Sequence, residues 1–285
     1  MLIVPERLAA ACRGTPERCT WLERLPRAIR ELQDKWSLSL GAPFDGSDAS
    51  CAWVATAVRG DGTRAVLKLG MPHMEAAHEL QALRFWDGDP TVRLLEADAG
   101  LNAMLLEYCE PGTALRKLPE LEQDVVIAGL LRRLWRRPAV PHPFRALSAM
   151  TAHWTDETIA AAPTWADAAL TREGLRLLEE LARPSSDDVL LATDLHAGNV
   201  LRAQREPWLV IDPKPFVGDR AYDATQHLFN CKSRMLAAAE ATIGNVADLL
   251  EIDEERIRLW MFARSAAEPR VTWDEDSVAL ARVLA

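Results

Sequence analysis

One stretch, residues 190–223, constrains the fold of this chain more than any other; it reads LLATDLHAGNVLRAQREPWLVIDPKPFVGDRAYD. Two short apolar runs, 188–191 and 208–211, flank its polar loop. A carboxylate follows each run: Asp194 comes shortly after the first and Asp212 directly after the second. Short apolar runs bounded by turn residues are typical of buried strands. The pattern predicts a strand–loop–strand unit with an acidic side chain at each strand end.

The spacing inside the loop indicates a specific chemistry. Asn199 follows Asp194 by five residues. Phosphoryl transfer uses this arrangement: an Asp accepts the proton of the substrate hydroxyl, an Asn turns back towards Mg²⁺, and a second Asp binds the metal after the next strand. Asp and Asn also favour ordinary turns, so the pair alone is weak evidence. The addition of Asp212 after a strand favours the catalytic interpretation.

The stretch resembles the small-molecule kinases of the aminoglycoside phosphotransferase superfamily, whose motif is HGDxHxxN followed by a strand and IDxx. Within that group, IDPKPFVGDRAYD is most similar to the streptomycin 6-phosphotransferase and hydroxyurea kinase family. The resemblance implies an α+β, bilobal protein-kinase-like fold, with a small antiparallel sheet in the N-lobe and a mainly helical C-lobe. We expect the N-lobe, with a helical extension, to span 1–108 and the C-lobe 109–285.

The resemblance also implies transfer of the γ-phosphoryl group of ATP to a hydroxyl of a small molecule. Asp194 is expected to be the catalytic base, and Asn199 and Asp212 the Mg²⁺ ligands.

Two β-rich runs in the N-terminal half, 51–58 and 63–69, are separated by Arg-Gly-Asp-Gly at 59–62, which predicts a hairpin. Lys68 lies on the second run. A solvent-facing lysine on an alternating strand is the plain interpretation. In a kinase, this position holds the lysine that binds the α- and β-phosphates and is oriented by a glutamate on a helix.

The helical pattern over 74–86 offers Glu75 and Glu79 as partners for that lysine. We favour Glu79, because it lies deeper in the helix. Ser50 precedes the first β-rich run, where a loop covering the phosphates would lie, and is the nearest match to the serine that the resembled kinases use there.

The run 103–108 reads AMLLEY and is followed by Pro111-Gly112. Its position resembles a kinase hinge, so the backbone at Glu107 and Tyr108 is expected to meet adenine.

Further helices are predicted from apolar periodicity. A helix with a proline at its first position starts at Pro16, and Pro26 is expected to kink or split it. The segment 118–135 is strongly amphipathic, with Leu121 and Val125 on its apolar face. Helices are also expected over 147–161, 166–181, 222–236, 235–250 and 253–267.

Composition limits the partners. The chain has 285 residues and a net charge of −9, which argues against nucleic acid as the main partner. No apolar run is long enough to span a membrane, and the N-terminus carries no cationic leader. The five cysteines form no CxxC pair, so neither a disulfide framework nor a zinc site is predicted. His227 is assigned to one face of a helix, without clustered ligands. These features predict a reduced, cytoplasmic protein, a monomer or weak dimer.

The negative charge suits a cationic small-molecule substrate, although acidic surfaces also serve solubility alone. In the resembled kinases, C-terminal helices wall the acceptor site, so an aminoglycoside of the streptomycin type is expected to meet Glu268 and Asp274 there. The plain alternative is that Asp274 starts the last helix, where acids favour the dipole. Streptomycin kinases tend to carry Trp near the place of Glu268. His196 is expected to brace the loop or adjoin the substrate.

One departure from the motif matters: Ala192 and Thr193 stand where the family has His-Gly. That histidine braces the loop and does not touch the reacting atoms, so the departure does not exclude activity. A kinase-like binding or regulatory protein with weak turnover is one alternative, and a kinase of hydroxyurea or another metabolite is a second. Retention of all four polar site residues (Lys68, Asp194, Asn199 and Asp212) favours an enzyme.

Overall fold

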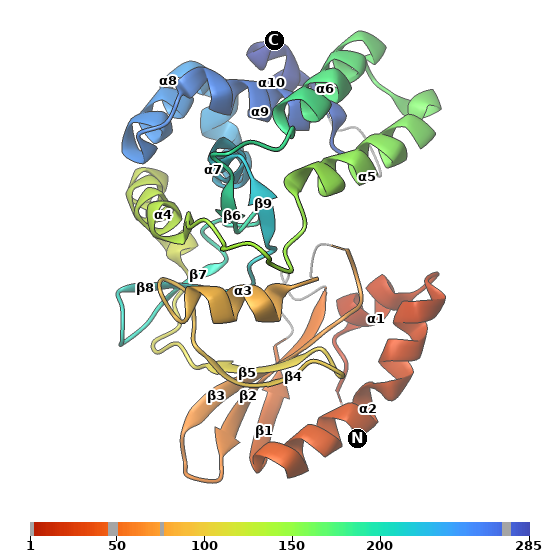
Figure 1. Cartoon of the computed structure of the whole chain (residues 1–285), viewed down its shortest axis with the longest axis vertical. Coiled ribbons are helices and arrows are strands. Elements are labelled where there is room, and N and C mark those ends of the chain that lie inside the picture. The colour runs from red at the N-terminus through yellow and green to blue at the C-terminus, as the bar shows by residue number, and fades with distance from the viewer. Residues whose placement is uncertain (1–2, 45–50, 75–76, 270–274) are drawn as a thin grey trace. The chain divides into compact units, whose positions relative to one another are not determined.

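The computed structural model describes residues 3–44, 51–74, 77–269 and 275–285. The chain forms two compact units (Figure 1): residues 1–113 with 201–211, and residues 114–200 with 212–285. The expected division into 1–108 and 109–285 did not anticipate that 201–211 belong with the first unit. They do so because Leu209 is buried in that unit's core and the amide of Val92 donates to the carbonyl of Val210.

The first unit is built on an antiparallel sheet of five strands in the order β1-β2-β3-β5-β4. The strands are β1 (Leu38–Pro43), β2 (Ala52–Arg59), β3 (Arg64–Gly70), β4 (Leu94–Asp98) and β5 (Ala103–Glu107). Residues alternate between its two faces. Leu67 and Leu105 face α1 (Glu6–Cys12) and α2 (Pro16–Trp36), whereas Val66 and Leu106 face α3 (Glu79–Trp86) (Figure 1). A short sheet of β7 (Val200–Arg202) and β8 (Trp208–Val210) completes the unit.

Pro26 does not split the N-terminal helix, contrary to one of the two outcomes expected for it. α2 continues from Pro16 to Trp36 with Pro26 inside it. A proline inside a helix costs about 3 kcal/mol. Leu25 and Leu32, on either side of the proline, are buried in the core against the sheet, and this packing offsets the cost.

The second unit is mainly helical. Its α-helices are α4 (Glu120–Leu134), α5 (Leu147–Ala160), α6 (Ala168–Leu181), α7 (Arg220–Asn230), α8 (Lys232–Leu250), α9 (Glu254–Ala267) and α10 (Glu275–Leu284). Two 3₁₀ turns, Leu115–Lys117 and Ala162–Thr164, and the antiparallel strands β6 (Val189–Leu191) and β9 (Phe216–Gly218) join them. α9 packs against α6, α7, α8 and α10. Gly174 lets α6 approach closely, since a Cβ there would lie 2.8 Å from the Cβ of Ala266.

The apolar face predicted for α4 is wrong at two positions. Leu121 and Val125 are 62% and 59% exposed, whereas Gln123 and Asp124 are buried. The polar pair is buried because each side chain has a partner: the amide of Gln123 donates to the carbonyl of Leu118, and Asp124 binds a histidine and an arginine described below.

None of the five cysteines, all within the described residues, forms a disulfide bond. Among the described segments, no helix combines the length and the apolarity that crossing a bilayer requires.

Candidate active site

The first unit contributes a buried ion pair. Lys68 lies on β3 and Glu79 begins α3. The lysine Nζ is 2.5 Å from Oε1 and 2.7 Å from Oε2 of Glu79, and the side chains are 8% and 4% exposed. Two buried charges are costly to desolvate, so such a pair needs close geometry to persist. Glu79 is thus confirmed as the partner of Lys68, whereas Glu75 and Ser50 lie outside the described residues.

The predicted hinge follows β5. The Glu107 carboxylate accepts hydrogen bonds from Arg205, from Nε at 3.0 Å and from Nη2 at 2.9 Å, and from the backbone amide of Arg93 at 2.9 Å. Burial opposes its ionisation, but the bonds from Arg205 and Arg93 lower the pKa of Glu107 below its ordinary value. The Tyr108 ring lies 3.8 Å from the Arg64 guanidinium carbon.

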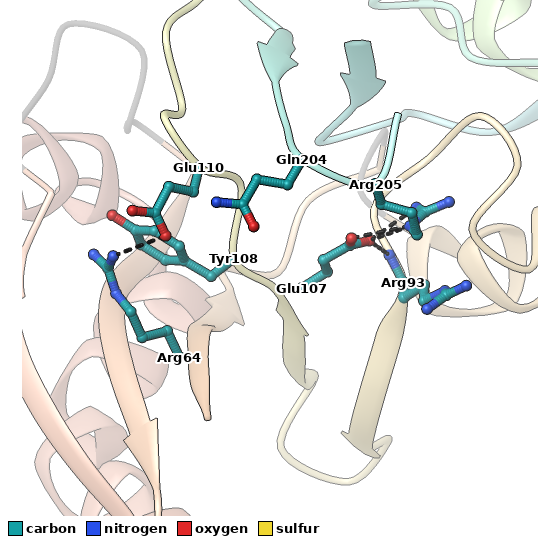
Figure 2. Close-up of a pocket in the computed structure, with 7 residues that line it drawn as sticks. All are labelled: Arg64, Arg93, Glu107, Tyr108, Glu110, Gln204 and Arg205. Atoms are coloured by element: carbon teal, nitrogen blue, oxygen red, sulfur yellow. Dashed lines mark hydrogen bonds and ion pairs between the residues drawn. The ribbon is translucent and has the colours of Figure 1, made fainter. Parts of the chain in front are cut away.

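These side chains line an open pocket of about 460 Å³, in which Gln204 lies between the stacked pair Arg64–Tyr108 and the ion pair Glu107–Arg205 (Figure 2). Both hinge side chains are therefore engaged within the first unit. Adenine binding by the backbone of Glu107 and Tyr108 stays a prediction.

In the second unit, the loop after β6 brings together Asp194 and Asn199. The backbone turns sharply before Asp194, where Thr193 adopts a left-handed conformation with φ of 48°. The Asn199 side-chain nitrogen donates to the Asp194 carbonyl at 3.0 Å, and its backbone amide donates to the His196 carbonyl. Since the amide nitrogen faces the loop, the Oδ1 atom is the end of the side chain suited to a cation.

Asp212 opens a second turn, also in a left-handed conformation, with φ of 53°. Its Oδ1 accepts from Lys214 Nζ at 2.7 Å. Lys214 is buried, and its backbone amide donates to the carbonyl of Ala192, which ties this turn to the Asp194 loop. Sequence reasoning missed Lys214; the signal was a lysine between two prolines, two residues after the predicted metal ligand.

Asp194 itself is largely shielded from solvent. Burial raises the pKa of its carboxyl above the ordinary value, while the charges of Lys214 and His196 pull the pKa down. The carboxylate of Asp212 and the amide oxygen of Asn199 are hard oxygen donors, which Mg²⁺ prefers. The donor set therefore fits a magnesium ion.

His196 folds over its own loop. Its Nδ1 accepts a hydrogen bond from the amide of Gly198 at 3.0 Å. A Cβ at position 198 would lie 2.7 Å from the imidazole Cε1, so the ring and the glycine are fitted to each other. This geometry supports the loop-bracing role expected for His196.

A pocket of about 290 Å³ lies among α7, α8, α9 and α10. Gln226, Arg264 and Glu268 line it. Glu268 binds Arg264 at 3.0 Å, and Asp276 on the same pocket binds Lys232 at 2.8 Å. Both carboxylates of the wall thus have a cationic partner. Asp274 lies outside the described residues.

His227 does have clustered ligands, contrary to the sequence-based expectation. Its Nε2 is 2.7 Å from Asp124 Oδ1 and 3.8 Å from Cys231 Sγ, and all three residues are buried. Arg234, however, binds both oxygens of Asp124 at 2.7 and 2.8 Å. Because a guanidinium already neutralises the carboxylate, we interpret the cluster as a buried ion-pair network between α4, α7 and α8 and not as a metal site.

Residues 35–277 match the family described as "Aminoglycoside/hydroxyurea antibiotic resistance kinase". The chain belongs to this family. A streptomycin 6-kinase of Streptomyces glaucescens is 34% identical to it, over 97% of this chain and 93% of that protein. A hydroxyurea phosphotransferase of Kitasatospora aureofaciens is 37% identical, over 93% of this chain and 80% of that protein. The resemblance seen in residues 190–223 is confirmed.

Solved structures show the same fold. A choline kinase from Streptococcus pneumoniae matches with a TM-score of 0.63 at 13% identity, covering 92% of this chain and 97% of that chain. An ethanolamine kinase from Plasmodium vivax matches with a TM-score of 0.58 at 13% identity, covering 90% and 83%. The predicted α+β, protein-kinase-like fold is confirmed.

The structure accounts for the missing histidine of the family motif. The carboxylate of Asp223 accepts hydrogen bonds from the amides of Ala192 at 3.0 Å and Thr193 at 2.7 Å, and from the indole of Trp135 at 3.0 Å. The Thr193 hydroxyl donates to the carbonyl of Lys214 at 2.5 Å. These contacts hold the loop at Ala192 and Thr193 without a histidine at position 192.

Proposed function

We propose that this member of the antibiotic resistance kinase family transfers the γ-phosphoryl group of ATP to a hydroxyl of a streptomycin-type aminoglycoside. The observation that carries the proposal lies in the second unit: a braced loop carries Asp194 and Asn199, and the turn at Asp212 is hydrogen-bonded to that loop through Lys214. Two curated relatives named streptomycin 6-kinase, at 34% and 36% identity, support this acceptor class.

Each polar group has a defined task in that reaction. Asp194 would accept or orient the proton of the attacking hydroxyl. Asn199 and Asp212 would hold Mg²⁺, which neutralises charge on the phosphates. Lys68, held by Glu79, would bind the α- and β-phosphates. Phosphoryl transfer depends mainly on positioning and charge neutralisation, so these groups suffice.

The pocket beside Gln226 is the proposed acceptor site. The Glu268 side chain lies on its wall with 27% of its surface exposed. A guanidinium of the acceptor would bind the accessible part of this carboxylate, next to Arg264. A cytoplasmic location suits this chemistry, because ATP is supplied there.

Hydroxyurea is the second candidate acceptor, and one observation favours it. Glu268 and Asp276 are both paired with basic side chains of the same unit, so the pocket wall is close to charge-balanced. A small uncharged acceptor fits such a wall without displacing an ion pair. A hydroxyurea phosphotransferase at 37% identity is among the relatives.

Turnover with purified protein tests the proposal. ATP consumption is measured with Mg²⁺ and either streptomycin or hydroxyurea, and the product is identified by mass spectrometry. A phosphorylated aminoglycoside supports the proposal. Phosphorylation of hydroxyurea alone moves the activity to the second candidate, and no product from either contradicts both.

A further inference from the structure

Arg264 lines the pocket among α7, α8, α9 and α10, yet its side chain is almost completely buried. It is 3% exposed. Its guanidinium donates to the Thr225 hydroxyl at 2.6 Å, to Gln226 Oε1 at 2.9 Å and to Glu268 Oε2 at 3.0 Å. Three aromatic rings surround it, with centroids at 4.7 Å (Tyr222), 4.8 Å (Phe229) and 5.6 Å (Trp154). Removing a guanidinium from water is unfavourable unless its charge and its N–H groups are paired. The surrounding groups therefore hold Arg264 in one fixed position.

That fixed position determines how the Gln226 amide is turned. Arginine has only donors, so the atom of Gln226 that faces it must be the carbonyl oxygen. The amide nitrogen then points the opposite way, where it is 2.9 Å from Asp194 Oδ1. An amide that is ambiguous in most structures is assigned here by its two neighbours.

From these contacts we infer that Gln226 and Arg264 are positioning residues for phosphoryl transfer. Arg264 orients the Gln226 amide, and Gln226 fixes the rotation of the Asp194 carboxylate by occupying Oδ1. We assign the other oxygen, Oδ2, to the acceptor hydroxyl. The inference rests on the proposed function. It assigns a role in the reaction to residues of α7 and α9 that lie outside the motif.

Loss of this positioning should appear in kcat. A carboxylate that rotates freely presents its lone pair correctly for only part of the time, and small misplacements of catalytic groups cost up to about 10²-fold. Gln226 also lines the acceptor pocket. A role limited to binding the acceptor would instead raise the KM for the acceptor and leave kcat unchanged.

Gln226→Leu is the informative variant, because Gln226 is only half-buried and its removal leaves the core of the unit intact. We expect kcat to fall about 10-fold or more with little change in the KM for ATP. Asn230→Ala is the matched control, because it also removes a side-chain amide, one turn further along α7. The Asn230 side chain is exposed, and its one described hydrogen bond goes to the backbone carbonyl of Gln226. It should leave kcat unchanged.

A second background separates positioning from general effects. In the Asp194→Asn protein, Gln226→Leu should lower the residual rate by less than 2-fold, since residues that act as one unit are not additive. Equal losses in the two backgrounds, or a kcat of Gln226→Leu within 2-fold of the parent, would overturn the inference.

A measurement without any acceptor keeps this test distinct from that of the proposed function. The side-chain NH₂ signals of Gln226, identified by their loss in Gln226→Leu, should shift in the ¹H–¹⁵N spectrum of Asp194→Ala and stay in place in Asn230→Ala. If the Gln226 signals do not shift in Asp194→Ala, the hydrogen bond between Gln226 and Asp194 is absent in solution and the inference is wrong. A parent protein that lacks turnover but shows the shift would contradict the proposed function while leaving the contact established.

Discussion

Asp212 and Lys214 show, at the scale of single residues, how a site can be held ready for a cation. The ammonium of Lys214 is 2.7 Å from the Asp212 carboxylate and is itself buried. A buried ammonium without a counter-charge would be costly, and the carboxylate of Asp212, which is 31% exposed, offsets the charge of Lys214. A divalent ion on Asp212 would then share the carboxylate with the ammonium or displace it.

Asp212→Asn should abolish the gain in nucleotide affinity that Mg²⁺ provides, since a neutral amide is a much weaker ligand for a hard dication than a carboxylate. Calorimetry with ADP, with and without Mg²⁺, measures the effect. Asp187→Asn is the control, because the Asp187 side chain is 86% exposed. Equal Mg·ADP affinities in Asp212→Asn and the parent would place the metal elsewhere.

Lys68→Ala should weaken ATP binding and lower turnover together, because it removes the charge assigned to the phosphates and leaves Glu79 buried without its partner. Lys35→Ala removes a half-exposed lysine and controls for loss of positive charge. Binding of the acceptor should not change. An unaltered KM for ATP in Lys68→Ala would argue against the phosphate-binding role.

At the scale of elements, α7 holds the catalytic loop through Asp223. This residue lies in the first turn of α7 and accepts three hydrogen bonds, two of them from the backbone beside Asp194. The Asp223 carboxylate therefore ties the loop that carries Asp194 to α7.

Asp223→Asn should destabilise the protein by about 2–4 kcal/mol, because an amide nitrogen would face backbone N–H donors in a fully buried site. Burial raises the pKa of Asp223 to about 6, against the hydrogen bonds that favour its charge. The folded state therefore binds the proton more tightly than the unfolded chain, and the contribution of Asp223 to stability falls as pH rises through this range. The difference in unfolding free energy between parent and variant should be larger at pH 5 than at pH 8. Urea unfolding of parent and variant at both pH values measures this difference. A difference in unfolding free energy that does not change with pH would contradict the raised pKa of Asp223.

Sequence patterns predicted elements better than they predicted the contacts between elements. The hairpin of β2 and β3, the strand β6 and the pairing of Lys68 with Glu79 all followed from short-range patterns. The network of Arg264, Gln226 and Asp194 did not follow from such patterns. Gln226 lies 32 positions from Asp194 and 38 positions from Arg264, and the periodicity of a single helix or strand does not reveal contacts over such distances. The exposure of Leu121 was missed for the same reason: the burial of Asp124 depends on Arg234, which lies 110 positions away.

At the scale of the whole molecule, charge is the property that bears on the choice of acceptor. The chain carries 42 acidic and 33 basic residues, a net charge of −9. Many of the acids in the described structure are paired, including both carboxylates of the pocket that we propose for the acceptor. Attraction of a cationic acceptor therefore depends on the summed field as well as on individual contacts.

The KM for streptomycin should rise as salt is raised from low to physiological concentration, where the screening length shrinks to about 8 Å. Hydroxyurea, which carries no charge, is the internal control, and its KM should stay flat. A flat KM for streptomycin would show that charge attraction does not hold this acceptor, and would favour the charge-balanced interpretation of the pocket.

The kcat of Asp194→Asn tests whether Asp194 activates the acceptor hydroxyl, as we propose. With saturating Mg·ATP and acceptor, we expect kcat to fall at least about 10²-fold, the lower range for loss of a general base. ADP affinity measured by calorimetry should remain nearly that of the parent, because Asp194 is assigned to the acceptor and not to the nucleotide. A kcat within a few-fold of the parent would contradict the account.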